Sequence, residues 1–231
     1  MRGKAMRKNE AKNLNKKMLK AAKNGGAARL GLLIAAGADV EAKDKEGWTS
    51  VMWAAATGQE ACMKLLIEAG GNIEAKSEAG RTAAMWAIRT GNTPCLGLLI
   101  GAGADLEAKD EDGRTAAMWA ASAGDKPCLE LLIGAGVDLG AKDEDGWTVA
   151  MWAALGGKEA CLQPLMEAGV DLDARDGYER TAASIAASNG HAGLASRIEG
   201  FRLSRSEAKE LRGAAVRAAG LNNLGPRGPR L

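Results

Sequence analysis

The chain has 231 residues, of which 46% are hydrophobic, 26% are charged and only 3% are aromatic. This is a globular composition whose core must come from Ala, Leu, Ile, Met and Val. No apolar run approaches the roughly 18 residues of a membrane-spanning helix. The single histidine, His191, excludes His-based metal sites and most His-dependent nucleophiles, so we expect no metal and no cofactor.

Charge is unevenly distributed, although the net charge is only +2. Residues 1–30 carry 10 basic and 1 acidic side chains, residues 31–195 carry 13 and 25, and residues 196–231 carry 8 and 3. Such asymmetry bears on partners and not on fold. The start lacks the apolar stretch of a secretory signal and only weakly resembles an organelle transit segment, so we expect a cytoplasmic or nuclear protein.

A period of thirty-three residues, the distance from Thr49 to Thr82, runs through the chain without slipping. It is marked by five threonines and four cysteines: Thr49, Thr82, Thr115, Thr148 and Thr181, and Cys62, Cys95, Cys128 and Cys161. Residues 80–112 and 113–145 differ at only eight positions, so these units must have nearly identical structures. Stacked helices lie about 8 to 10 Å apart, which exceeds the roughly 7 Å that a disulfide spans, so we predict four buried, reduced thiols.

Each unit reads as two short helices and a loop. Thr82 caps a helix that Gly91 ends, and Thr93 with Pro94 opens a second helix that runs to Ala102. The following segment, Ala-Asp-Leu-Glu-Ala-Lys-Asp-Glu-Asp-Gly, has turn residues and no helical period, which predicts a loop reaching to the next unit.

This unit, with Thr at its start, Ala-Ala and Gly in its middle and Leu-Leu with Gly-Ala-Asp toward its end, resembles the ankyrin repeat. The resemblance implies an all-α solenoid of stacked helix-turn-helix units joined by β-hairpin-like loops. A basic segment, residues 1–13, would precede six repeats, of which the first and last are caps. These are residues 14–46, 47–79, 80–112, 113–145, 146–178 and 179–211.

Two departures from the family pattern and one C-terminal capping pattern carry predictions. The usual Thr-Pro-Leu-His is replaced by Thr-Ala-Ala-Met, so Met and the following Trp should refill the lost volume. Pro164 falls inside a second helix, which predicts a kink or a shortened helix. Ser204 and Glu207 form a capping-box pattern, which predicts a separate helix over residues 204–220, before a flexible tail at 221–231.

No catalytic constellation is present, and we expect a monomeric, non-enzymatic scaffold that binds a protein or peptide on its concave face. Trp53, Trp86, Trp119 and Trp152 recur at one position of four successive units and are expected to lie on that face. They are either an exposed recognition stripe or packing between units. With the acidic excess, an exposed stripe would suit a basic peptide through charge and cation–π contacts. The candidate binding residues are Trp48, Trp53, Arg81, Trp86, Glu111, Asp112, Arg114, Trp119, Glu144, Asp145, Trp147 and Trp152.

The clustered N-terminal bases support an alternative, a nucleic-acid-associated protein. These bases are Lys4, Arg7, Lys8, Lys12, Lys16, Lys17, Lys20 and Lys23. Clustered bases can bind phosphate backbones or serve as a nuclear address. They can equally form the solvated face of a cap, or fold onto the acidic body.

Overall fold

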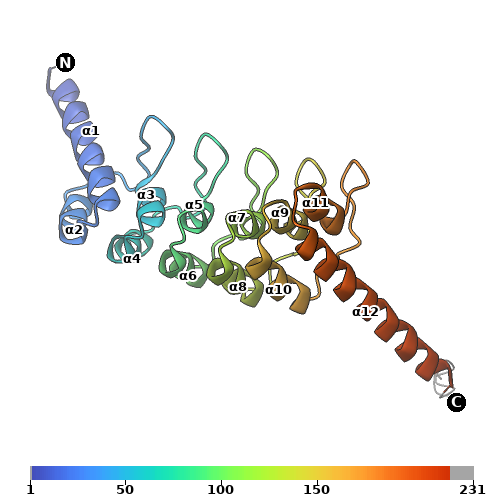
Figure 1. The fold of residues 1–231 in the computed structure, drawn as a ribbon. Coiled ribbons are helices and arrows are strands. Elements are labelled where there is room, and N and C mark those ends of the chain that lie inside the picture. Colours follow the sequence, from blue (N-terminus) through green and yellow to red (C-terminus); the bar gives the residue numbers. More distant parts are fainter. Residues whose placement is uncertain (1, 219–231) are drawn as a thin grey trace, which may run out of the picture.

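The computed structural model describes residues 2–218, which form six helix pairs in two parallel rows (Figure 1). The first helices of the pairs are α1 (Arg2–Lys23), α3 (Ser50–Thr57), α5 (Ala83–Arg89), α7 (Ala116–Ala123), α9 (Val149–Leu155) and α11 (Ala182–Ser188). The second helices are α2 (Ala27–Ala35), α4 (Glu60–Glu68), α6 (Thr93–Gly101), α8 (Lys126–Gly134), α10 (Glu159–Glu167) and α12 (Ala192–Ala218). Residues 2–218 contain no strand, so the predicted all-α solenoid is confirmed.

The predicted helix boundaries follow from capping groups. The hydroxyl of Thr82 accepts a hydrogen bond from the backbone N–H of Met85, which starts α5, and Thr49 does the same for α3. The hydroxyls of Thr115 and Thr148 have no hydrogen-bond partner, although both residues hold the same N-cap position. Gly58 ends α3 in the left-handed conformation, with φ of +68°, which glycine adopts without strain.

The core lies between the two rows of helices and is built from repeated small contacts. The methionines of the Thr-Ala-Ala-Met motif and its equivalents are 0 to 1% exposed: Met52, Met85, Met118 and Met151. The four cysteines are free and fully buried, as predicted. Five of the six tryptophans pack against this core while half-buried, so methionine fills the interior and tryptophan covers its edge.

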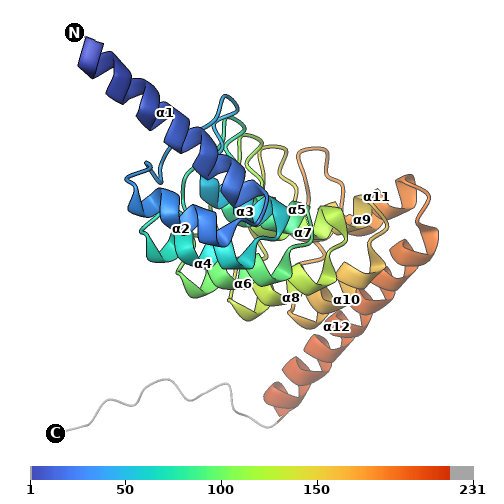
Figure 2. The same cartoon turned by 90° about the vertical axis from the view of Figure 1, so that its left-hand side faces the viewer.

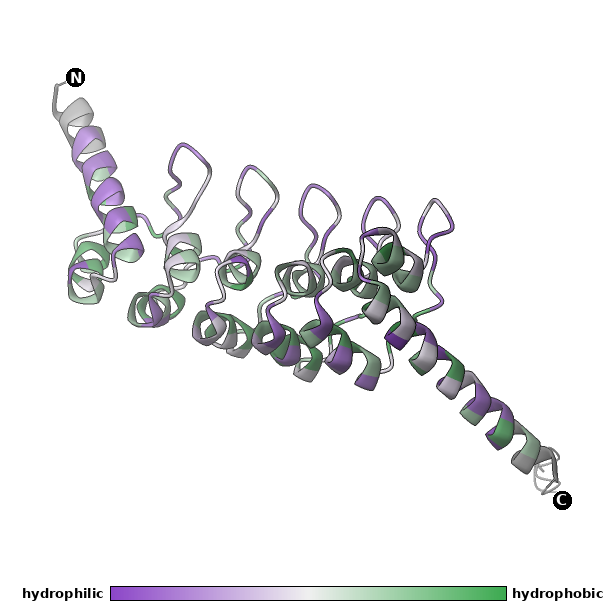
Figure 3. Ribbon diagram, viewed as in Figure 1, coloured by the Kyte–Doolittle hydropathy of each residue, from purple (hydrophilic) through white to green (hydrophobic). Residues whose placement is uncertain are grey.

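The loops stand in a row beside the first helices, one behind another when the stack is viewed from its end (Figure 2), and they are mostly hydrophilic (Figure 3). Each is held to the next by side chains that recur along the stack, among them a column of lysines at one position of four successive loops. The ammonium groups of Lys76 and Lys109 each donate to the carbonyl of the equivalent residue in the following loop, at 2.8 Å. Glu74 accepts from the backbone N–H of Asp105 in the next unit. The lysine column is thus a structural feature of the stack.

The prediction of a separate helix that begins at Ser204 is wrong, because α12 continues without a break from Ala192 to Ala218. The hydroxyl of Ser204 donates to the carbonyl of Phe201 within the helix, so it is not a cap. The left-handed glycines that follow α6, α8 and α10 are Gly103, Gly136 and Gly169. Their equivalent in the last unit is Arg202, which continues the helix. The predicted end of that helix at residue 220 and the tail at 221–231 lie outside the described residues.

The predicted shortening of the helix at Pro164 is also wrong, because α10 has nine residues, as do α4, α6 and α8. The backbone N–H of Ala168 still donates to the carbonyl of Pro164, so the helical backbone hydrogen bonds resume after the missing donor. Leu162 and Leu165 are fully buried on either side, and their packing stabilises the turn.

At the N-terminus, α1 crosses the expected boundary between residues 13 and 14 without interruption. Residues 9–13 are exposed, whereas Met18, Ala21 and Ala22 are buried in the core. The C-terminal half of α1 is therefore the first helix of the stack, and its N-terminal half projects beyond it (Figure 1).

Candidate interaction surface

The loops and the first helices α3, α5, α7, α9 and α11 share one surface, here called the inner face. It is organised by hydrogen bonds from tryptophan to an aspartate nine residues earlier, which is buried at Asp110 and Asp143 and half-buried at Asp44. The indole N–H of Trp119 donates to Asp110 at 3.0 Å, and that of Trp152 donates to Asp143 at 2.8 Å. Trp53 donates to Asp44 in the same way. Each aspartate also accepts two backbone N–H groups of its own loop, which fixes the loop against its helix.

A continuous series of ring and cation contacts crosses the inner face from one unit to the next. We call it the tryptophan–arginine ladder, and its members are Trp53, Trp48, Trp86, Arg81, Trp119, Arg114, Trp152, Trp147 and Arg180. The Trp48 ring lies 4.4 Å from that of Trp53 and 4.0 Å from that of Trp86, which belongs to the next unit.

The cationic members of the ladder alternate with the rings. The Arg81 guanidinium lies 5.3 Å from the ring of Trp86 and 4.7 Å from that of Trp119, and Arg114 bridges Trp119 and Trp152 at 4.4 and 5.6 Å. Arg180 reaches Trp147 at 5.3 Å. At such distances a cation is attracted to the ring face, so the ladder ties neighbouring repeats together.

The candidate binding residues fall into two groups by exposure. Trp86 is 8% exposed, and the other five tryptophans are half-buried, as are Arg81 and Arg114. The four acids Glu111, Asp112, Glu144 and Asp145 are exposed at the loop tips. The tryptophans therefore pack between units and still contribute part of the accessible inner face, beneath a row of carboxylates.

A family model of ankyrin repeats in three copies matches residues 18–110, 94–176 and 117–198. The chain belongs to the ankyrin repeat family. Ankyrin repeats generally mediate protein–protein interactions, and members of the family typically act as non-enzymatic scaffolds. No curated protein matches the chain.

In this ankyrin protein, sequence reasoning missed the residues that hold the inner face together. The buried aspartates are 7% exposed at Asp110, 9% at Asp143 and 5% at Asp176. For Asp110 and Asp143 the signal in the sequence is the distance of nine residues to a tryptophan, which Asp44 and Trp53 share. Asp176 has Ile185 at that distance and pairs with Arg180 instead. Two contacts at the ends of the tryptophan–arginine ladder were missed as well. The Lys23 ammonium lies 3.8 Å from the Trp53 ring, and the ring of Tyr178, which is 79% exposed, lies 5.1 Å from the Arg180 guanidinium.

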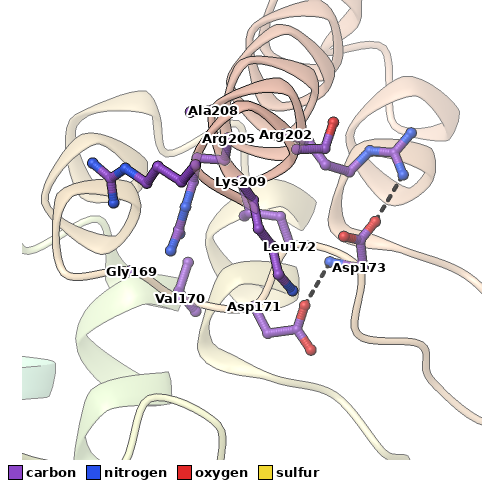
Figure 4. Close-up of a pocket in the computed structure, with 11 residues that line it drawn as sticks. Gly169, Val170, Asp171, Leu172, Asp173, Arg202, Arg205, Ala208 and Lys209 are labelled. Carbon is purple, nitrogen blue, oxygen red and sulfur yellow. Dashed lines mark hydrogen bonds and ion pairs between the residues drawn. The ribbon is translucent and has the colours of Figure 1, made fainter. Parts of the chain in front are cut away.

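The ankyrin stack also has a cavity of about 690 Å³ between α12 and the segment after α10 (Figure 4). Its lining includes Arg202, Arg205 and Lys209 from α12 and Asp171 and Asp173 from the segment. The Arg202 guanidinium forms an ion pair with Asp173 at 2.7 Å, which joins the extended helix to the fifth unit. Within residues 2–218, no group of three or more His, Cys, Asp and Glu side chains could hold a metal ion, and no helix is long and apolar enough to cross a membrane.

Proposed function

We propose that this ankyrin protein binds a basic protein or peptide on its inner face, through the carboxylates of the loop tips above the tryptophan–arginine ladder. The observation that carries the proposal is the exposed column Glu78, Glu111 and Glu144, one residue from each of three successive loops. Among the described residues, none of these three carboxylates forms an ion pair.

The geometry of the tryptophan–arginine ladder supports different roles for the tryptophans and the exposed acids of this face. The indole N–H groups of Trp53, Trp119 and Trp152 already bind aspartates, and arginines already contact the rings of Trp119 and Trp152. Those interactions hold the tryptophans rigidly, so a partner meets a preorganised apolar floor and loses little entropy on binding. The unpaired acids at the rim would then select a partner by charge.

The test is affinity capture from cell extract with the whole chain and with a triple variant, Glu78→Gln, Glu111→Gln and Glu144→Gln. We expect the variant to lose most of the captured basic protein, and the wild-type interaction to weaken as salt rises. The matched control neutralises three exposed acids of the second helices, Glu68, Glu130 and Glu167, and should keep the partner. Equal loss in both triple variants would contradict a role for the inner face.

A second candidate function, nucleic-acid binding, is favoured by the side of α1 that carries Lys12, Lys16, Lys17 and Lys20. All four are exposed, and in the described part of the chain none forms an ion pair. Unpaired lysines along one helix can contact successive phosphates. Lys4, Arg7 and Lys8 belong to α1 as well, but their side chains lie outside the described residues.

Binding of generic RNA and DNA separates this candidate from the first. If α1 binds nucleic acid, deletion of residues 1–13 should weaken it and flatten its salt dependence, while α2 to α11 stay folded because packing begins at Leu14. Binding that survives the deletion unchanged would exclude the basic segment.

The four free, buried thiols support our placing of the protein in the reducing cytoplasm or nucleus, which imaging of the tagged full chain would test.

A further inference from the structure

One loop of the stack lacks the aspartate around which the others are built. The equivalent positions in successive units are Asp44, Ser77, Asp110, Asp143 and Asp176. Serine at position 77 is shorter than aspartate and carries no charge. The loop between α4 and α5 therefore has no internal carboxylate at this point.

The neighbouring loop shows what that carboxylate does. Asp110 accepts hydrogen bonds from the backbone N–H groups of Asp112 and Arg114 at 3.1 and 2.9 Å. Its other oxygen accepts from Nε of Arg114 at 3.3 Å and from Nε1 of Trp119 at 3.0 Å. Four donors from one loop and one helix thus converge on a single carboxylate.

The Ser77 loop has the same backbone path. Its closing bonds, Ser77 N–H to the Arg81 carbonyl and Gly80 N–H to the Ser77 carbonyl, are both 3.0 Å. The equivalent bonds at Asp110 are 3.1 and 3.0 Å, and the turn glycines Gly80 and Gly113 have φ of +68° and +75°. The backbone N–H groups around position 77 are therefore placed as they are around Asp110.

At position 77 the side-chain donors have no acceptor. Nε of Arg81, Nε1 of Trp86 and the hydroxyl of Ser77 are all buried without a hydrogen-bond partner. Ser77 and Trp86 are each 8% exposed, and within residues 2–218 Arg81 forms no ion pair, whereas Arg114 and Arg180 pair with Asp110 and Asp176. Buried donors are normally satisfied, and orphaned ones cost free energy until an acceptor arrives.

We propose that Ser77, Arg81 and Trp86 form a binding site for a carboxylate that is supplied from outside the loop. The ligand carboxylate takes the place of the missing aspartate side chain, accepts from Arg81 Nε and Trp86 Nε1, and neutralises the Arg81 guanidinium. Charge-assisted hydrogen bonds of this kind are about twice as strong as neutral ones. The site goes beyond the proposed function, because it concerns one position and requires no protein partner.

The chemistry is common to two sources, a small free carboxylate and an acidic side chain of a bound protein. Formate is the smallest probe of the first, and the dipeptide-like N-acetyl-aspartate N-methylamide is a probe of the second. If both bind, the site is open to an acidic residue of a partner on the inner face. If formate alone binds, the site takes a free anion.

The experiment measures the thermal midpoint of the full chain in sodium formate and in sodium chloride at equal ionic strength. We expect formate to raise the midpoint by about 2 to 4 °C in a saturable way, because a ligand that binds only the folded state stabilises it. Ser77→Asp should raise the midpoint without formate and abolish the formate response, because its own carboxylate fills the site. Ser77→Ala, which removes one donor and adds no carboxylate, should weaken the formate response without abolishing it.

Two further outcomes would overturn the site. Formate and chloride could have equal effects on the wild type, which would mean that water alone fills the space at Ser77. The formate response could also persist in full in Ser77→Asp or in Arg81→Leu, which would place the binding elsewhere.

Discussion

The indole N–H of Trp119 donates to the carboxylate of Asp110, nine residues earlier, across the junction between a loop and the helix that follows it. The contact recurs at Trp53 and Trp152 with Asp44 and Asp143. It fixes each loop against the first helix of its unit and shields the aspartate from water. Because the contact recurs in three units, the same pair of residue types orders the inner face in each of them.

We expect Asp110→Ala to lower the free energy of unfolding by about 3 kcal/mol, because it leaves Trp119 Nε1 and Arg114 Nε without an acceptor. Asp112→Ala is the control, because the Asp112 side chain is 67% exposed and its pair with Arg114 should contribute under about 1 kcal/mol. Urea unfolding followed by circular dichroism measures both. Equal losses of unfolding free energy in the two variants would mean that the contribution of Asp110 does not depend on its burial.

We expect Trp119→Ala to destabilise the chain by about 2 kcal/mol, below the roughly 3 to 5 kcal/mol of a fully buried tryptophan, because this ring is only half-buried. The lost contacts include Arg81 and Arg114, which lie on the ring from two units. Glu111→Ala, an exposed control, should change stability by less than about 0.5 kcal/mol. A stable Trp119→Ala protein that loses its partner would favour recognition over packing.

The four thiols should react slowly with iodoacetamide at about pH 8, near the ordinary thiol pKa, in the folded chain, and urea should release four equivalents. Burial raises the pKa of the Cys95 and Cys161 thiols to about 11 and that of Cys128 to about 12, so little thiolate is present. The folded pKa values of the thiols lie above the unfolded value of about 8.5, so the protonated thiols favour the folded state. The free energy of unfolding should therefore fall as the pH rises from about 8.5 toward about 11 to 12. Fast labelling of the native protein would show that the column is accessible.

We expect Pro164→Leu to raise the thermal midpoint, because a proline inside a helix removes a hydrogen-bond donor and costs up to about 3 kcal/mol. The matched opposite change is Leu131→Pro, which places proline at the same position of α8 and should lower the midpoint. Differential scanning calorimetry compares the two with the wild type. A lower midpoint for Pro164→Leu would show that the packing around position 164 accommodates only the smaller proline ring.

Asp176 should make the contact between the fifth and sixth units sensitive to acid. Burial raises the pKa of its carboxyl, but hydrogen bonds from the backbone N–H groups of Arg180 and Tyr178 and from the Arg180 guanidinium outweigh burial and hold the pKa below its usual value. A depressed folded pKa stabilises the chain above the unfolded pKa of about 3.9, and that stabilisation is lost as the pH falls through the folded pKa. The unfolding midpoint of Asp176→Asn should therefore fall less between pH 5 and pH 2 than that of the wild type, as measured by circular dichroism; identical slopes would contradict this.

The constant spacing of the repeats by itself determined the helix pairs, the buried cysteines and the row of loops, because each unit contacts only its neighbours and equal units must stack equally. Local signals were sufficient where they end a helix, as at Thr82 and Gly58. They failed at Ser204, since a capping pattern cannot start a helix where no glycine has ended the one before it.

Only the tertiary structure decided how the inner face is built. A sequence gives the spacing of Trp119 and Asp110, but the hydrogen bond between them needs the loop to fold back over its helix. The same folding brings Arg81 of one unit onto Trp119 of the next, and it turns the absence of a carboxylate at Ser77 into buried donors without an acceptor. Contacts between units depend on the three-dimensional stacking, which no single repeat encodes.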